Sequence, residues 1–392
     1  MKRIVAVVAL GLLALGLLAP GAEAGRRYLF TPKIKAGAEY NDDVQYLGDG
    51  DMVFTVTPEL QLEIDSERTE HTITASLTRY KYADLDSFDR TETGVSLESV
   101  HRATERLTLR GNVGYEVDYT LTSAEDEYGT TAEMAERGVF SLGARAEYMA
   151  TELLLLGLSY NYSSTQYDSK YVDVAGHSLG LDAAWRITER TTLLGAVSEG
   201  WYASEFLDSG EGDYRVTSFT AGIRHRLTEI WTVFGTGGVR LSENDLDTGG
   251  TDDVFYDEGW ILNAGVEWQF ERSRGELVYS HDNTAGLSGS RLDRDRIRIS
   301  HTYRTTERSA LTANAGVTQS KSDGVLTDSK YRGWSAGLAW RYDTTEDSRL
   351  WIGYQHQASE NLLSHDENDR NRYYIRFEVG FPEEWTLGGA RW

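Results

Sequence analysis

The chain has 392 residues, a formal charge of −23, 39 glycines, 4 prolines and no cysteine, and its mean hydropathy is −0.46. The absence of cysteine excludes disulfide frameworks and thiolate metal sites, and the acidic excess argues against nucleic acid as a partner. Many glycines with few prolines fit an extended sheet, because proline breaks strand ladders.

The first 24 residues have the organisation of a secretory signal peptide. Lys2 and Arg3 precede an apolar or glycine run that ends at Leu18, and an A-x-A cleavage site ends at Ala24. The run is too short for a good transmembrane helix, and no later stretch approaches the roughly 18 apolar residues that such a helix needs. We therefore expect an exported chain whose mature part, residues 25–392, is a single domain.

After residue 25 the dominant pattern is strict alternation of apolar and polar residues, which predicts β-strands. Between Phe54 and Ile64, for example, every second residue is apolar. The pattern returns about 18 times, and residues 384–392 are either a tail or a partial further strand. The predicted strands begin near Tyr28, Met52, Thr69, Thr91, Arg106, Gly138, Leu153, His177, Thr191, Val216, Trp231, Trp260, Glu276, Arg296, Ala310, Trp334, Arg349 and Arg372.

Two kinds of connection alternate along the chain. The short kind is built on a Thr/Ser-Glu pair, as in Thr104-Glu105-Arg106, and one gap, Glu271 to Arg274, lacks the pair but lies where a turn is due. The long kind is acidic and rich in glycine and serine. Its members are residues 41–51, 84–90, 123–137, 163–176, 204–215, 242–259, 283–295, 320–332 and 359–370.

These features together predict an all-β antiparallel transmembrane β-barrel of about 18 strands, with a range of about 16–19, in the cell outer membrane. A strand that crosses a bilayer needs about 9–11 residues, and the sheet must close so that every backbone group is paired. Tyrosine and tryptophan cluster at strand ends, where aromatic girdles are expected. Two other kinds of all-β fold agree less well with these features. A β-propeller needs four short strands per repeat. A β-sandwich or β-helix adhesin does not need acidic loops at one end only.

Alternation places the charged residues on the face opposite the apolar one, which is the lumen of a barrel, because charges are costly against lipid. The basic residues expected there are Lys33, Lys35, Arg110, Arg145, Arg186, Arg224, Arg226, Arg240, Arg296, Arg298, Arg304, Arg341 and Arg376. The acidic ones are Glu39, Glu59, Glu63, Glu116, Asp118, Glu147, Asp182, Glu267, Glu271 and Glu378. Two interpretations stay open: the arginines pair with neighbouring carboxylates and fill space, or they form a basic track for an anionic solute.

Two motifs carry a resemblance to a known family. One is the Thr-Glu-Arg turn followed by Leu-x-Leu-x-Gly, as in residues 104–111, and the other is Tyr40-Asn41-Asp42-Asp43-Val44 at the end of the first strand. With them the mature chain resembles the "putative β-barrel porin" family of type 2 barrels, which is often associated with exopolysaccharide and exosortase gene clusters. The resemblance implies an outer-membrane channel or export component without catalytic residues. The strand count also resembles alginate-type exporters, in which a basic lumen passes an anionic polymer.

Catalytic and metal-binding patterns are not found in the sequence. Two Ser/His pairs are adjacent in the sequence, His177-Ser178 and Ser300-His301. Alternation sends the two side chains of each pair to opposite faces. An incomplete calcium-loop pattern begins at Asp245, but its twelfth position is Tyr256 instead of glutamate. We therefore expect no enzyme, no metal site and no cofactor.

The first functional hypothesis is a porin-like channel for hydrophilic solutes, anionic solutes among them. The alternatives are an outer-membrane export duct for an exopolysaccharide and a structural or adhesive surface barrel without transport. The partners expected are outer-membrane lipid and lipopolysaccharide, the barrel-assembly machinery and, for the export duct, periplasmic export components. The chain ends in an aromatic residue, Trp392, and Phe381 is the aromatic end if the last strand stops there. Such an aromatic end resembles the C-terminal assembly signal of outer-membrane barrels.

Overall fold

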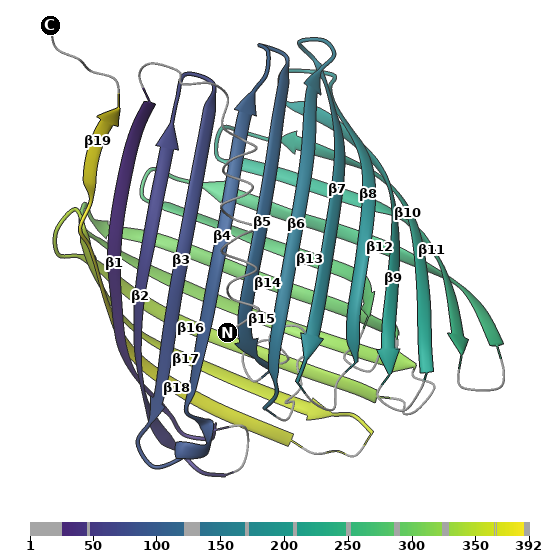
Figure 1. Cartoon of the computed structure of the whole chain (residues 1–392). Coiled ribbons are helices and arrows are strands. Elements are labelled where there is room, and N and C mark those ends of the chain that lie inside the picture. The colour runs from purple at the N-terminus through teal and green to yellow at the C-terminus, as the bar shows by residue number, and fades with distance from the viewer. Residues whose placement is uncertain are drawn as a thin grey trace, which may run out of the picture.

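The computed structural model describes residues 26–44, 48–120, 134–168, 172–206, 210–247, 252–285, 291–323, 329–363, 365 and 367–387. The predicted signal peptide and Trp392 lie outside the described residues. Eighteen antiparallel strands form a closed, tilted barrel (Figure 1), which confirms the predicted fold class and strand count. Within the described residues, no helix is long and apolar enough to cross a membrane.

Each strand pairs with the strands before and after it in the chain. The first nine are β1 Arg26–Asn41, β2 Asp51–Asp65, β3 Thr69–Tyr82, β4 Arg90–Arg102, β5 Leu107–Tyr119, β6 Glu136–Met149, β7 Leu154–Tyr167, β8 Asp173–Arg186 and β9 Thr191–Phe206. The others are β10 Gly210–Arg226, β11 Trp231–Asp247, β12 Asp252–Gln269, β13 Ser273–Ala285, β14 Arg291–Thr306, β15 Ser309–Asp323, β16 Ser329–Asp343, β17 Ser348–Asn361 and β18 Glu367–Gly380. A short 3₁₀ helix, η2 (Asp86–Phe88), lies between β3 and β4.

The barrel closes where β1 pairs with both β2 and β18. A further short strand, β19 (Glu383–Leu387), pairs with the beginning of β1 in the register of β18, since Lys33 lies opposite Gly380 and Phe30 opposite Glu383. Pro382 separates β18 from β19 because proline has no N–H to donate. The N–H of Phe381 still donates to the carbonyl of Pro32 (2.8 Å). The uncertain C-terminal segment is therefore, as far as Leu387, an extension of the last strand.

Strands that follow long connections begin earlier than predicted. β8, β10 and β12 begin at Asp173, Gly210 and Asp252 instead of His177, Val216 and Trp260. The predicted loops 204–215 and 242–259 were therefore partly wrong, because most of their described residues continue the hairpins. Hairpin ends in water need no apolar face, so alternation cannot reveal them.

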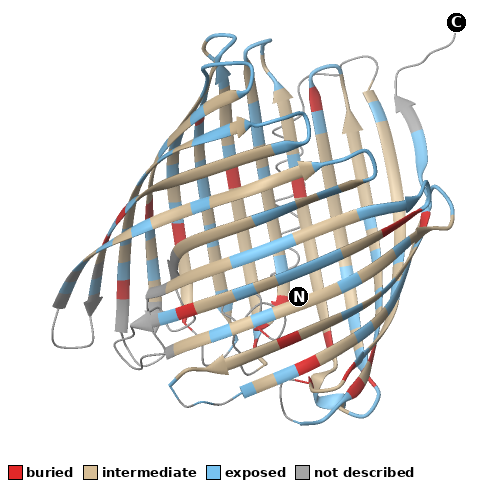
Figure 2. Cartoon of the chain, turned by 180° about the vertical axis from the view of Figure 1, so that it is seen from behind, coloured by how far each residue is buried: buried red, intermediate tan, exposed pale blue. Residues whose placement is uncertain are grey.

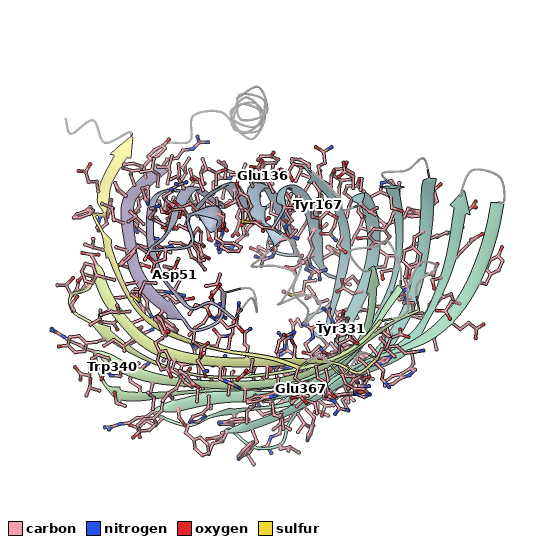
Figure 3. The ribbon with its side chains drawn as sticks, turned by 90° about the horizontal axis from the view of Figure 1, so that it is seen from below. Asp51, Glu136, Tyr167, Tyr331, Trp340 and Glu367 are labelled. Atoms are coloured by element: carbon pink, nitrogen blue, oxygen red, sulfur yellow. The ribbon has the colours of Figure 1, made fainter. Side chains whose placement is uncertain are left out.

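The two faces of the barrel wall differ in chemistry. Large apolar side chains that are exposed, such as Leu181, Trp185 and Ile297, lie on one face of their strands, and Figure 3 shows Trp340 of this face outside the barrel and Asp51 of the other face inside it. Buried residues are few and scattered along the strands (Figure 2). The wall is thus one sheet thick with its apolar side outward, and the described residues form no central hydrophobic core.

Candidate functional site

The inner face of the barrel can be followed around the ring from the strand register. Directly opposed residues in antiparallel strands point to the same face, and Asp51 marks the inner one. This face carries all the predicted candidates except Glu271, which lies in the turn between β12 and β13 because β12 ends at Gln269. That the other residues border a water-filled pore stays a prediction.

On β1 to β6 the inner-face cations are paired with carboxylates. Lys35 Nζ lies 2.7 Å from Glu59 Oε2, and Arg110 Nε lies 3.2 Å from Glu147 Oε2. Arg145 binds Glu147 (2.9 Å) and also reaches across β7 to Asp182 (2.7 Å). Most charges on this side of the wall therefore neutralise one another, as the first interpretation of the arginines expects.

Glycine makes the Arg145–Asp182 contact possible. Gly157 lies on β7 directly between the two strands that carry the pair, opposite Asp182 and Glu147. A Cβ at this position would lie 2.5 Å from both an Arg145 nitrogen and an Asp182 oxygen. A side chain at position 157 would therefore separate the ion pair.

On β8 and on β10 to β18 the pairing is less complete. Arg224 contacts Glu267 across β11, and Arg341 and Arg376 each contact one carboxylate, Asp343 at 3.4 Å and Glu39 at 3.3 Å. Among the described residues, we find no hydrogen-bond or ion-pair partner for the side chains of Arg186, Arg298 and Arg304. Arg296 shares Asp282 (3.1 Å) with Arg294 (3.0 Å). This part of the wall keeps an excess of positive charge, as the second interpretation expects.

Sequence reasoning missed several residues of the inner face. Arg137, Arg294 and Arg370 fell inside predicted long loops, and the structure places them in β6, β14 and β18. Continuing the alternation by a few residues into each loop would have found them. Trp351 was also missed, because tryptophan in a barrel sequence is expected in the outer girdles.

Two loops fold against the inner face at the end of the barrel that carries the long connections. Val44 is 2% exposed and packs with Val53 and Tyr82, and residues of the β3–β4 loop, Leu85 and Phe88, pack against this cluster. The carboxylate of Asp51 accepts hydrogen bonds from the N–H groups of the same loop, at positions 84 and 85. These loops therefore cover part of the inner face of β2 and β3 at this end of the barrel.

An ionised carboxylate ties the β3–β4 loop to the wall. Asp89 accepts a hydrogen bond from Lys81 Nζ (2.7 Å) and another from the N–H of Tyr82 (2.8 Å). The hydrogen bond from Lys81, followed by the one from Tyr82, holds the pKa of Asp89 below its usual range. Within the described part of the chain, no group of three or more side chains is arranged to hold a metal ion.

Comparison with solved structures identifies barrels of the same architecture. The alcaligin outer membrane receptor FauA from Bordetella pertussis superposes with a TM-score of 0.53 at 8% identity, covering 92% of this chain and 77% of the receptor. The ferric citrate transporter FecA gives 0.51 at 7% identity, with coverage of 89% and 78%. OccAB2 from Acinetobacter baumannii gives 0.50 at 9% identity, with coverage of 91% and 98%. At these identities the likeness shows the fold alone.

Sequence comparison gives one family and no curated relative. No curated protein matches the chain. The model of the family described as "Putative beta-barrel porin 2" matches residues 18–171, which confirms the resemblance inferred from the turn and Asn-Asp-Asp motifs over that segment. The chain therefore has the fold of outer-membrane β-barrels, and its residues 18–171 carry the sequence pattern of a porin family.

Proposed function

We propose that the chain is a non-enzymatic outer-membrane channel through which hydrophilic solutes pass passively, with a preference for anions. The observation that carries the proposal is the closed ring of eighteen strands with an apolar outer face and a charged inner face. Barrels of about 16–18 strands leave an aqueous channel. The match of residues 18–171 to a porin family supports the same function.

Selection would combine size and charge. The loops around Val44 and Phe88 cover part of the inner face at one end of the barrel and would limit the size of a solute. Arginines without carboxylate partners, such as Arg298 and Arg304, raise the local concentration of anions because low-dielectric walls focus their field. An apolar outer face implies contact with outer-membrane lipid and lipopolysaccharide, and the predicted signal peptide and barrel-assembly machinery would deliver the chain there.

Conductance across a planar bilayer tests this function. The purified protein should give stepwise currents, and under a potassium chloride gradient the reversal potential should show that chloride passes more easily than potassium. Replacing Arg296, Arg298 and Arg304 together by glutamine should move the reversal potential toward cations. The control is Arg79→Gln, on the outer face, which should leave it unchanged.

Other outcomes identify the alternatives. A small conductance that acidic sugar polymers block would indicate a dedicated exopolysaccharide export duct. A barrel that inserts and passes no current would contradict the channel and indicate a structural or adhesive surface protein. An unchanged reversal potential in the triple variant would contradict the role given to these arginines.

A further inference from the structure

We propose that the inner face of β14 to β18 carries a binding track for anionic oligosaccharides, formed by Arg304, Arg341, Arg376 and Trp351. The proposal rests on the channel function and names the class of solute that this wall recognises. It follows from the position of one tryptophan, the spacing of three arginines and the neutral polar surface beside them.

Trp351 is on the unexpected face of its strand. Seven other tryptophans with described side chains lie on the outer face, at positions 185, 201, 231, 260, 268, 334 and 340. Trp351 lies directly opposite Arg341 on β16 and Arg376 on β18, which are both inner-face residues. Its ring is partly exposed, and it has no hydrogen bond or ring contact with the described residues. An aromatic face is thus presented to the interior of the barrel.

Three arginines and this ring form one row across the wall. The register runs Arg304, Ala310, Arg341, Trp351, Arg376 from β14 to β18, so a cation stands on every second strand. Neighbouring strands lie about 4.8 Å apart, so the backbone positions of successive cations are about 10 Å apart. The side chains of Arg341 and Arg376 are 46% and 58% exposed, and each has one carboxylate contact. A guanidinium has five N–H donors, so most of them remain available.

On the side away from the short turns, the two rows next to these cations carry no carboxylate, whereas the row on the side of the short turns carries Asp343, Arg349 and Glu378. One row is Thr302, Thr312, Ala339, Gly353 and Tyr374, and the next is Ser300, Asn314, Gly337, Gln355 and Arg372. Hydroxyl and amide groups both donate and accept hydrogen bonds. The guanidinium of Arg376 also lies 4.4 Å from the centre of the Tyr374 ring, which keeps a second aromatic side chain beside the row.

This combination selects a polyhydroxylated anion with an apolar ring face. The arginines recognise carboxylates, the hydroxyl and amide groups recognise hydroxyls, and the Trp351 ring packs on the apolar face of a sugar. A small inorganic anion uses only one arginine, whereas an oligomer with a charge on each unit contacts several. Affinity should therefore rise steeply with the length of the oligomer.

The wall on the other side of the barrel provides a matched control. Arg110 of β5 is also on the inner face and 51% exposed, and it contacts a single carboxylate, Glu147, as Arg341 contacts Asp343. Its strand carries no inner-face tryptophan. Arg110→Gln and Arg341→Gln therefore remove the same charge from the interior, but only Arg341→Gln removes it from the track.

Calorimetry on the purified barrel and current block in bilayers test the track with defined probes. Hexagalacturonate should bind and block at least about a hundredfold more strongly than monomeric galacturonate. Maltohexaose, which is neutral, and hexaglutamate, which has no sugar ring, should bind weakly. Binding should weaken as salt rises, because salt screens exposed charges.

Variants assign the binding to these residues. Trp351→Leu should weaken hexagalacturonate binding about tenfold, whereas Trp351→Phe should retain most of it, and neither should move the reversal potential because no charge changes. Trp340→Leu, on the outer face, should bind as the unmodified protein does. Arg341→Gln should weaken binding, and Arg110→Gln should leave it unchanged.

Failure of the track and failure of the channel give different results. A conducting barrel that does not bind hexagalacturonate, or that binds it equally well after Trp351→Leu, overturns the track and leaves the channel intact. Equal loss in Arg110→Gln and Arg341→Gln also overturns it, since general charge would then explain binding. Calorimetric binding in a barrel that passes no current supports the track and contradicts the channel.

Discussion

Asp42 shows what one residue of the Asn-Asp-Asp motif does in the folded chain. It lies just after β1, and its two carboxylate oxygens accept hydrogen bonds from the backbone N–H (2.6 Å) and the side-chain amide (2.7 Å) of Asn371 on β18. Its own N–H donates to the carbonyl of Asn371 (3.1 Å). The motif therefore joins the first strand to the last at the end of the barrel that carries the long connections.

Removal of this carboxylate should weaken the closure of the barrel. We expect Asp42→Ala to lower the free energy of unfolding by about 1–3 kcal/mol, because the amide groups of Asn371 lose their acceptor. Urea unfolding in detergent or lipid, with the change in gel mobility on heating as a second measurement, detects the loss. Glu105→Ala, in an exposed turn, is the control. Identical midpoints for the two variants would contradict this role of Asp42.

At the residue scale, the sequence predicted which face a side chain takes better than what it contacts. Alternation placed Arg145 and Asp182 on the inner face, but only the structure shows that they meet across the glycine of β7. Such a contact joins strands that are not neighbours, so it depends on the curvature of the wall. Trp351 was overlooked because a tryptophan in a barrel sequence is normally assigned to a girdle.

The short turns show how a repeated dipeptide becomes a repeated structure. The hydroxyl of the threonine accepts hydrogen bonds from the N–H groups two and three residues later, at Thr104, at Thr151 and at Thr228. The turn that begins at Ser66 has a related bond from the N–H of Thr69. A side-chain oxygen thus satisfies N–H groups that the strand ladders leave unpaired.

Loss of this hydroxyl should destabilise a single hairpin. In Thr228→Ala the N–H groups of Ile230 and Trp231 lose the acceptor that lies 3.1 and 3.0 Å away. We expect the free energy of unfolding to fall by about 0.5–1.5 kcal/mol, and Thr228→Ser to restore it. Urea unfolding followed by tryptophan fluorescence measures both variants. If serine and alanine are equally destabilising, the methyl group of threonine matters and the hydroxyl does not.

At the element scale, the short turns were predictable and the outer ends of the hairpins were not. The lipid-facing part of a strand must be apolar on one side, and the hydroxyl turn needs a specific residue, so both leave a pattern. Beyond the apolar band of the outer face, the hairpins of β9 to β12 continue through polar sequence. Their strands are held by backbone hydrogen bonds, which any residue except proline can make.

On the scale of the whole molecule, the inner face is continuous around the closed ring, because directly opposed residues of neighbouring strands lie on the same face. From β1 the register carries the inner face through every strand to β18, and Arg376 of β18 then lies opposite Gly37 of β1, again on the inner face. An even number of strands is required for this antiparallel closure. The sequence specifies this strand register. If a strand slipped by one residue, its inner-face charged side chains would turn to the lipid side.

Water should therefore reach alternate residues of a single strand. The chain has no cysteine, so single cysteines can be introduced on β16 at Ser335 and Ala339 of the inner face and at Ala336 and Leu338 of the outer face. In liposomes, a membrane-impermeant maleimide should label the first two rapidly and the last two at least about tenfold more slowly, because thiolate reactivity requires exposure to water. Labelling in denaturant shows that all four thiols are present. Equal labelling of both faces would contradict a lipid-embedded wall, and protection of both inner positions would contradict a water-filled interior.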